Sequence, residues 1–239
     1  MTVPEWTLAI ETSTRQGSLA LLHEGRLHSE LTLELGTAHG QSLLPGIARL
    51  LQQQKLTPRQ LQLVAVSQGP GSYTGLRVGV VCAKLLAWSL RIPLVAVDTL
   101  QALAADCTTS VDRLWIVTDA QRDAVYAACF FLPAPHTPET LVPTMVLPAD
   151  QLASQLRPTD VVRGPAVEKL VQSAPNLADQ MTANQITGDL VCPSARRVGE
   201  LAISAHRRGE QSDPRGLTPV YLRQSSAETQ WDRLHPPAG

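Results

Sequence analysis

The sequence predicts an α/β protein of two lobes, and two observations carry this prediction. Short apolar stretches alternate with helix-period stretches between residues 61 and 97, a pattern typical of parallel strands joined by helices. The strand–turn–strand pattern at the start of the chain returns near its middle, which indicates a duplicated hairpin opening each lobe. At 239 residues, with 44% hydrophobic and 4% aromatic residues, the chain has enough aliphatic side chains for cores of ordinary size.

The first three strands are expected at residues 7–13, 17–23 and 26–34. Each stretch is short, and the connections contain the turn residues Thr14 to Gly17 and the pair Glu24-Gly25. Tight connections of this kind join neighbouring antiparallel strands, so the three strands should form a meander.

A helix follows from residue 40 or 41. Five apolar residues recur at helical spacing and should lie on one face: Leu43, Leu44, Ile47, Leu50 and Leu51. Pro45 has no amide hydrogen, so the helix must begin close enough to place it in the first turn.

The remaining elements extend the α/β pattern. A strand at 61–67, a helix at 74–90 and a strand at 94–97 complete a first lobe, 1–107. A second lobe, 108–223, opens with strands at 114–120 and 124–131 and contains a helix at 194–206 that Ser194 can cap. Six prolines make residues 133–160 an expected irregular region. The polar segment 224–239 is expected to be a disordered tail.

Composition excludes several classes of function. The net charge is −1 and no cluster of basic residues stands out, so a partner is expected to hold any RNA. The four cysteines are widely spaced and are interpreted as reduced core thiols. We find no signal peptide, and the apolar stretch 78–90 is too short to span a bilayer, so we expect a cytoplasmic protein.

Two turns could bind phosphate. One follows the first strand and contains Glu11, Thr12 and Ser13; the other is the glycine loop 69–75 before a helix, where backbone amides favour anions. A tight strand-to-helix turn made by the glycines is the favoured explanation. Asp119 matches Glu11 in the second hairpin, but its turn continues Ala-Gln-Arg-Asp, which puts bulky side chains where phosphate needs bare backbone. We identify no catalytic nucleophile and no metal-ligand spacing. An ATPase or phosphotransferase using Glu11 and Asp119 remains the alternative.

The second predicted helix carries a ridge of small residues, Gly75, Gly79 and Ala83, that would allow another helix to approach closely. The two helices also have more apolar surface than one sheet needs, and this favours a protein-binding site. The simpler explanation, that this surface only covers the sheet, has equal weight. The expected partner interface consists of His39, Leu43, Leu44, Ile47, Leu51, Tyr73, Leu76, Gly79, Val80, Ala83, Leu86 and Ala87.

Several segments together resemble a known group of proteins. These are the opening strand Leu8-Ala-Ile-Glu-Thr-Ser-Thr, the helix start at His39, the glycine loop with its helix, the segment Thr118–Tyr126 and the closing Pro219-Val-Tyr-Leu-Arg. In these five segments the chain is similar to the threonylcarbamoylation branch of the actin/sugar-kinase-like superfamily. The resemblance is strong over residues 7–107 and thinner beyond. It implies a ribonuclease-H-like two-lobe fold with a short, degenerate second lobe.

Two families share this opening, and one place separates them. TsaD carries two metal-binding histidines after the second β-α unit, where this chain has Thr99 and Leu103. The chain therefore resembles the TsaB family, a non-catalytic subunit. The resemblance implies binding to TsaD and TsaE, pairing with itself when alone, and contact with tRNA only through the complex. It also implies that ATP and magnesium bind only in that complex. A charge at Leu43 is then expected to abolish binding and leave the fold intact.

Overall fold

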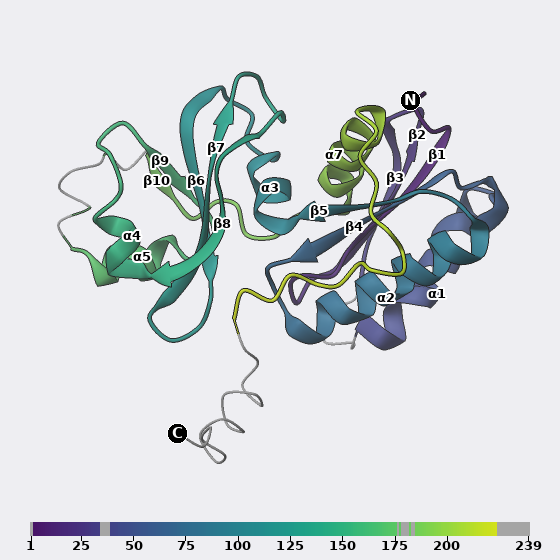
Figure 1. Ribbon diagram of the computed structural model, residues 1–239, viewed down its shortest axis with the longest axis horizontal. Helices are drawn as coiled ribbons and strands as arrows, with labels where there is room; N and C mark the ends of the chain where they lie inside the picture. The colour runs from purple at the N-terminus through teal and green to yellow at the C-terminus, as the bar shows by residue number, and fades with distance from the viewer. Residues whose placement is uncertain (1, 34–38, 176, 178–181, 183–184, 224–239) are drawn as a thin grey trace, which may run out of the picture.

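The framework consists of two five-stranded sheets, one in each half of the molecule (Figure 1). The computed structural model describes the chain except for residues 1, 34–38, 176, 178–181, 183–184 and 224–239. The segment 224–239, which we expected to be a disordered tail, lies outside the described residues.

The first sheet has the strand order β3-β2-β1-β4-β5. Its first three strands form the predicted antiparallel meander, and β4 and β5 continue it in parallel. The strands are β1 (Trp6–Glu11), β2 (Ser18–His23), β3 (Arg26–Thr32), β4 (Leu63–Gly69) and β5 (Leu94–Asp98).

The second sheet repeats this arrangement. Its order, β8-β7-β6-β9-β10, has the same antiparallel meander and the same two parallel strands as the first. The duplication inferred from one hairpin therefore extends to all five strands. They are β6 (Val111–Asp119), β7 (Ala124–Leu132), β8 (Glu139–Pro148), β9 (Val161–Arg163) and β10 (Ile186–Thr187).

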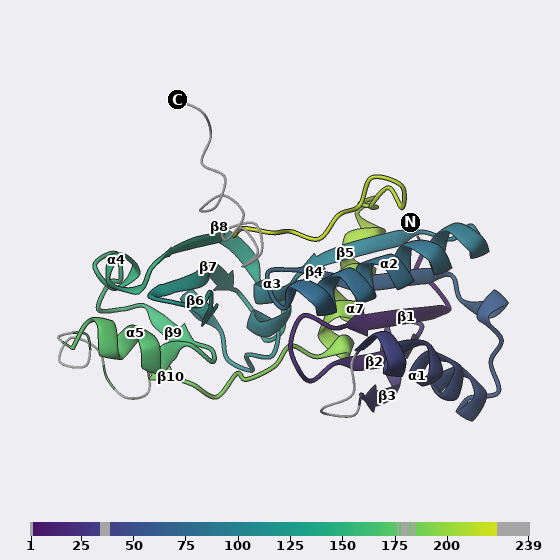
Figure 2. The same ribbon diagram turned by 90° about the horizontal axis from the view of Figure 1, so that it is seen from below.

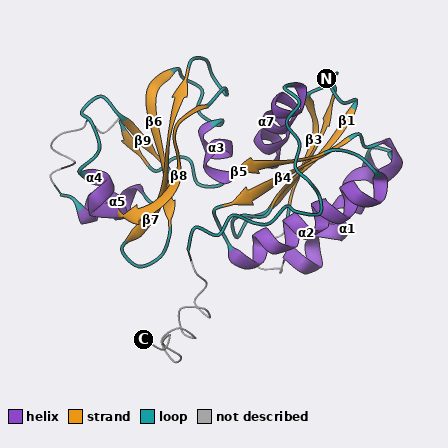
Figure 3. Ribbon diagram, in the orientation of Figure 1, coloured by secondary structure: helices purple, strands orange, loops and turns teal. Residues whose placement is uncertain are grey.

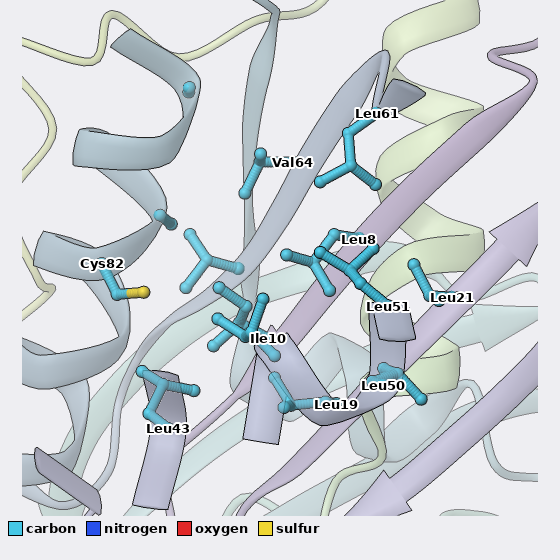
Figure 4. Packing of buried hydrophobic residues seen from close by; sticks show 14 of the residues in the cluster. Leu8, Ile10, Leu19, Leu21, Leu43, Leu50, Leu51, Leu61, Val64 and Cys82 are labelled. Atoms are coloured by element: carbon cyan, nitrogen blue, oxygen red, sulfur yellow. The ribbon is translucent and has the colours of Figure 1, made fainter. Parts of the chain in front are cut away.

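Helices cover both faces of the first sheet, as the views in Figures 1 and 2 agree. Strand residues alternate between the faces, so Leu8 and Ile10 pack under α1 (His39–Gln53) and α2 (Tyr73–Leu90), while Ala9 packs under α7 (Ala195–Arg207). The close-up in Figure 4 shows Leu43 of α1 and Cys82 of α2 in the same apolar cluster as the strand residues. A short 3₁₀ turn, Pro58–Gln60, follows α1.

The second sheet is covered in the same manner by shorter helices. α4 (Ala149–Ala153) and α5 (Val167–Ser173) pack on one face, and α3 (Thr99–Ala104) packs on the other. Figure 3 shows α3 and α7 between the two sheets. This packing corrects the division at residues 107 and 108: α3 precedes that boundary but covers the second sheet, and α7 follows it but covers the first. A periodicity identifies a helix and does not say which sheet the helix covers.

Two further expectations are wrong in detail. α1 begins at His39 at the latest, so Pro45 lies in its second turn, on the exposed side, where the carbonyl of Gln41 that loses its helical bond can reach water. The proline-rich region 133–160 is largely regular, because it contains β8 and α4. Pro143 is tolerated in β8 since that strand is at the edge of its sheet.

The architecture is the expected two-lobe α/β fold, with a mixed five-stranded sheet in each lobe. The second copy of the repeat is the reduced one: β9 and β10 have three and two residues, and α4 and α5 have five and seven. The three cysteines within the cores, Cys82, Cys107 and Cys129, are free, and burial raises the pKa of each thiol to about 11. They act as small apolar side chains.

Candidate functional site

Most residues expected at the partner interface are buried within the chain. They hold α1 and α2 to the first sheet and have at most 5% of their surface exposed: Leu43, Ile47, Leu51, Leu76, Val80, Ala83 and Ala87. Leu86 packs against the same core and is half-buried. The expectation that the seven buried side chains meet a partner is therefore corrected, because they form the inward stripe of each helix and are almost completely inaccessible.

A different apolar stripe faces outward. Leu44 of α1 is 61% exposed, and Val81, Leu85 and Trp88 of α2 are 54%, 58% and 64% exposed. The three residues of α2 recur at i, i+4 and i+7 and so lie on one side of the helix. We define the docking face as these four residues together with the exposed Ala48 of α1.

Sequence reasoning found one of the large residues of the docking face and missed three. Leu44 is one position after Leu43, which rotates it by about 100° from the buried stripe. The signal that could have found Val81, Leu85 and Trp88 is that α2 is apolar all round: a helix with two apolar stripes has one more than the sheet can cover. A hollow of about 430 Å³ adjoins Trp88 at the end of α2, lined also by Arg91, Ile92 and Pro214.

The small-residue ridge of α2 receives the turn that follows β1. A Cβ atom added at Gly75 would clash with the carbonyl oxygen of Thr12, and one added at Gly79 would clash with Thr12 Oγ1. The Thr12 hydroxyl also donates a hydrogen bond to the carbonyl of Gly75 at 2.8 Å. The ridge is therefore occupied by the chain itself, and the expected approach of a second helix along it is corrected. Gly75 and Gly79 are required by this close backbone approach.

His39 and Tyr73 also have partners within the chain. His39 Nε2 lies 2.8 Å from the carbonyl oxygen of Thr14, and its ring packs between Gly17 and Gly75, so it fastens α1 to the first turn. The Tyr73 ring stacks on Tyr221 with centroids 4.6 Å apart, and Arg77 covers Tyr73 and donates to both hydroxyls. Both residues expected at the interface thus have structural roles within the chain.

The first phosphate-like turn uses its polar groups internally. The Ser13 amide donates to the Glu11 carboxylate, and the Ser13 carbonyl accepts from Ser72 at 2.6 Å. Glu11 is fully buried, and burial raises its pKa to about 7 against the opposing hydrogen bonds from Ser13. A carboxyl group in this position is shielded from any ligand, and the turn offers little free backbone to hold phosphate.

A cleft of about 800 Å³ lies between the lobes. It is lined by the turn residues Ser13 to Arg15, the start of α2, the β6–β7 turn and the segment after α7. Thr99 and Leu103 of α3 line it as well, at the positions where the resemblance to TsaD would require metal-binding histidines. No three His, Cys, Asp or Glu side chains in the described part of the chain are grouped as metal ligands would be.

Asp119 lines this cleft but Glu11 does not, so the structure does not bring the two carboxylates together. Asp119 accepts from the Gln121 amide at 2.9 Å and from Lys169 at 2.7 Å. Gln121 and Arg122 have positive φ angles of 64° and 49°, a conformation that side chains disfavour. Asp119 therefore stabilises a strained turn.

The segment after α7 connects both lobes. The Val220 amide donates to Gln68 at 2.8 Å, and Lys84 Nζ donates to the Leu217 carbonyl at 2.7 Å, so the segment is fastened to β4 and α2. Arg223 then donates to the carbonyls of Ala120 and Gln121 in the β6–β7 turn. The closing motif noted in the sequence is therefore a strap across the cleft.

Comparison with known proteins gives consistent matches. The family model described as TsaD, tRNA N6-adenosine threonylcarbamoyltransferase, matches residues 34–186. The tRNA threonylcarbamoyladenosine biosynthesis protein TsaB of Bacillus subtilis is 33% identical over 94% of this chain and 96% of its own length. The Escherichia coli protein of that name is 26% identical over 95% and 97%. The solved structure of YeaZ from Pseudomonas aeruginosa has a TM-score of 0.77 and 28% identity, covering 93% of this chain and 100% of that chain.

Proposed function

The chain belongs to the TsaB family of tRNA threonylcarbamoyladenosine biosynthesis proteins, and from this we propose that it is a non-catalytic subunit that binds and activates TsaD. It does so together with TsaE. The product is threonylcarbamoyladenosine at the adenosine next to the anticodon of ANN-decoding tRNAs. The chain acts in the cytoplasm and contacts tRNA through the complex.

The observation that carries this proposal is the docking face. Four large apolar side chains, each more than half exposed, lie on α1 and α2, and these two helices contact each other. Single exposed apolar residues are common, but a contiguous group on two packed helices marks a protein-binding surface. Because the buried stripes of both helices already cover the sheet, the outward stripe has no task within the chain.

The non-catalytic role is supported by the geometry of the cleft. Glu11 is buried away from the cleft, Asp119 is committed to its own turn, and Thr99 and Leu103 offer no imidazole. The first turn also uses its backbone groups internally. We therefore propose that the isolated chain binds no nucleotide and that ATP and magnesium bind only when the partners are present.

A second copy of the chain is the occupant proposed for the docking face when TsaD is absent. A two-fold pair presents the same patch from both subunits, so an exposed apolar stripe can cover itself. The heteromeric and self-paired states then compete for one surface, and each excludes the other.

Reconstitution tests the proposal. Cognate TsaD and TsaE are incubated with tRNA, ATP, magnesium and the threonylcarbamoyl donor, with and without this chain, and the modified nucleoside is measured by mass spectrometry. We expect formation of product to depend on the chain, and the chain alone to bind no ATP in equilibrium dialysis. Product formation of equal rate without the chain, or micromolar ATP binding with hydrolysis by the chain alone, would reject the proposal.

A further inference from the structure

The charges of the chain are distributed very unevenly around the docking face. Residues 35–97 contain no aspartate or glutamate, although the whole chain has 21 of them. The same stretch contains six basic residues, Arg49, Lys55, Arg59, Arg77, Lys84 and Arg91. A chain with a net charge of −1 therefore has one strongly positive segment, and that segment includes α1 and α2.

Two of these cations flank the docking face directly. Arg49 follows Ala48 on α1, and Arg91 ends α2 three residues after Trp88; both side chains are exposed. Neither forms an ion pair with any carboxylate that the structure describes. Lys84 is bound to backbone carbonyls, which leaves its charge in place.

Among the described carboxylates, Asp213 lies near this rim and offsets one of its positive charges. Asp213 precedes Pro214, which lines the hollow beside Trp88, and its two oxygens accept from the amides of Arg215 and Gly216, which leaves its negative charge in place. Glu30 of β3 accepts from the Arg196 amide of α7, on the opposite face of the sheet from α1. The docking face thus combines an apolar centre with a rim that is mainly positive.

We propose that the docking face is built for a different protein that presents an apolar surface with an acidic rim. This inference rests on the proposed function and adds the chemistry of the partner. Opposite charges around an apolar contact steer the encounter and select the partner, whereas like charges oppose it. A second copy brings a positive rim against a positive rim, so self-pairing is held back by repulsion.

Exposed aliphatic side chains favour a protein over a nucleic acid as the occupant. A phosphate backbone can pair with Arg49 and Arg91 but gains nothing from Leu44, Val81 and Leu85, which would remain partly wet. An apolar protein surface with acidic residues around it buries these side chains and also pairs the cations, which is the usual anatomy of an interface with an apolar core and a polar rim.

The two pairings should respond to salt in opposite directions, and this gives the test. The Debye length, over which charges act on each other, falls from about 30 Å at 0.01 M salt to about 3 Å at 1 M. Salt therefore weakens the attraction between opposite rims and the repulsion between like rims. Binding of the chain to cognate TsaD is measured by surface plasmon resonance from about 0.05 to about 0.5 M NaCl, with self-association followed by sedimentation velocity in the same buffers. We expect the association rate with TsaD to fall at least about tenfold over this range, while self-association strengthens.

Charge reversal at the rim provides the matched comparison. The double variant Arg49→Glu/Arg91→Glu should bind TsaD at least about tenfold more slowly at low salt and lose most of its salt dependence. The control Arg26→Glu/Arg157→Glu changes the net charge by the same amount. Arg26 is exposed at the start of β3 and Arg157 is exposed in the segment after α4, so both lie outside the docking face. This control should bind TsaD as the unaltered chain does.

The outcomes separate the inference from the function on which it rests. A complex with TsaD that forms with a flat salt profile, and is indifferent to Arg49→Glu/Arg91→Glu, overturns the acidic-rim partner and leaves the proposed function standing. Absence of a complex at every salt concentration overturns both. Labelled tRNA is titrated as a third arm: binding of tRNA by the isolated chain that is lost in Arg49→Glu/Arg91→Glu would assign the rim to RNA and overturn the inference.

Discussion

Replacing Leu85 by aspartate is the sharpest perturbation of the docking face. Leu85 is 58% exposed and makes no part of the buried stripe of α2, so Leu85→Asp should leave the free energy of unfolding within about 0.5 kcal/mol of its original value. On docking, the variant loses burial of roughly half a leucine side chain, about 1 kcal/mol. It must also desolvate an unpaired polar group, which costs about 1–3 kcal/mol.

Together these terms amount to about 3 kcal/mol, or about a 100-fold increase in Kd for TsaD. Isothermal titration calorimetry measures the Kd, and urea unfolding followed by circular dichroism measures the stability. The matched control is Leu141→Asp, which makes the same change at a residue of β8 that is 48% exposed in the other lobe. A Leu85→Asp chain that binds as tightly as Leu141→Asp would refute the reasoning.

The same substitution at Leu43 cannot serve as this test, although the sequence suggested it. Leu43 is 1% exposed and belongs to the core that joins α1 to the first sheet (Figure 4). An aspartate there would be buried without a partner, and the chain should unfold. Loss of binding by Leu43→Asp would therefore report loss of the fold.

Three further predictions concern the turns and the strap. Burial raises the pKa of Glu11 from 4.5 to about 7, so the stability that its protonated form contributes is present below pH 4.5 and lost as the pH rises through 7. Glu11→Gln should reduce the fall in unfolding free energy over this pH range by about 3 kcal/mol. A pH profile in chemical denaturation that is the same for Glu11→Gln and the unaltered chain would contradict this. Gly79→Ala should destabilise the chain by about 1–3 kcal/mol. Adding Thr12→Ala removes the clashing hydroxyl and leaves the Cβ atoms of residues 12 and 79 at 3.4 Å, so it should recover part of that loss. Full additivity of the two substitutions in the double-mutant cycle would count against the packing. Arg223→Ala removes the donor to the carbonyls of Ala120 and Gln121, and should increase the rate of limited proteolysis in the β6–β7 turn, whereas equal rates would assign the strap no role there.

Much of the fold could be predicted because its signals are local. Turn residues and the apolar pattern of the first strands indicated the meander, and the second hairpin repeated it strongly enough to reveal the duplication. Ser194 was recognised as the cap of α7, and its hydroxyl accepts from the Arg197 amide. These features depend on neighbours within a few residues, which a single sequence contains.

The predictions that failed concerned contacts between segments that are distant in the sequence. Nothing near Thr99 or Ala195 says that α3 covers the second sheet and α7 the first, because such crossovers are a property of the whole topology. The small residues Gly75 and Gly79 gave the right feature and the wrong neighbour, since Thr12 is more than sixty positions away. The sequence placed the expected partner interface on the inward stripes of α1 and α2, because both stripes of α2 are apolar and periodicity alone does not say which one meets the sheet.

The most direct test of the central claim is whether Trp88 becomes buried when TsaD binds. The chain is labelled with 5-fluorotryptophan, its four ¹⁹F signals are assigned by substitution to phenylalanine, and TsaD is titrated while solvent exposure of each signal is measured. We expect the Trp88 signal, from a side chain that is 64% exposed in the free chain, to shift and become protected, with Trp6 and Trp115 unchanged. A complex that forms with Trp88 still exposed would contradict the claim that this helix face is where the partner binds.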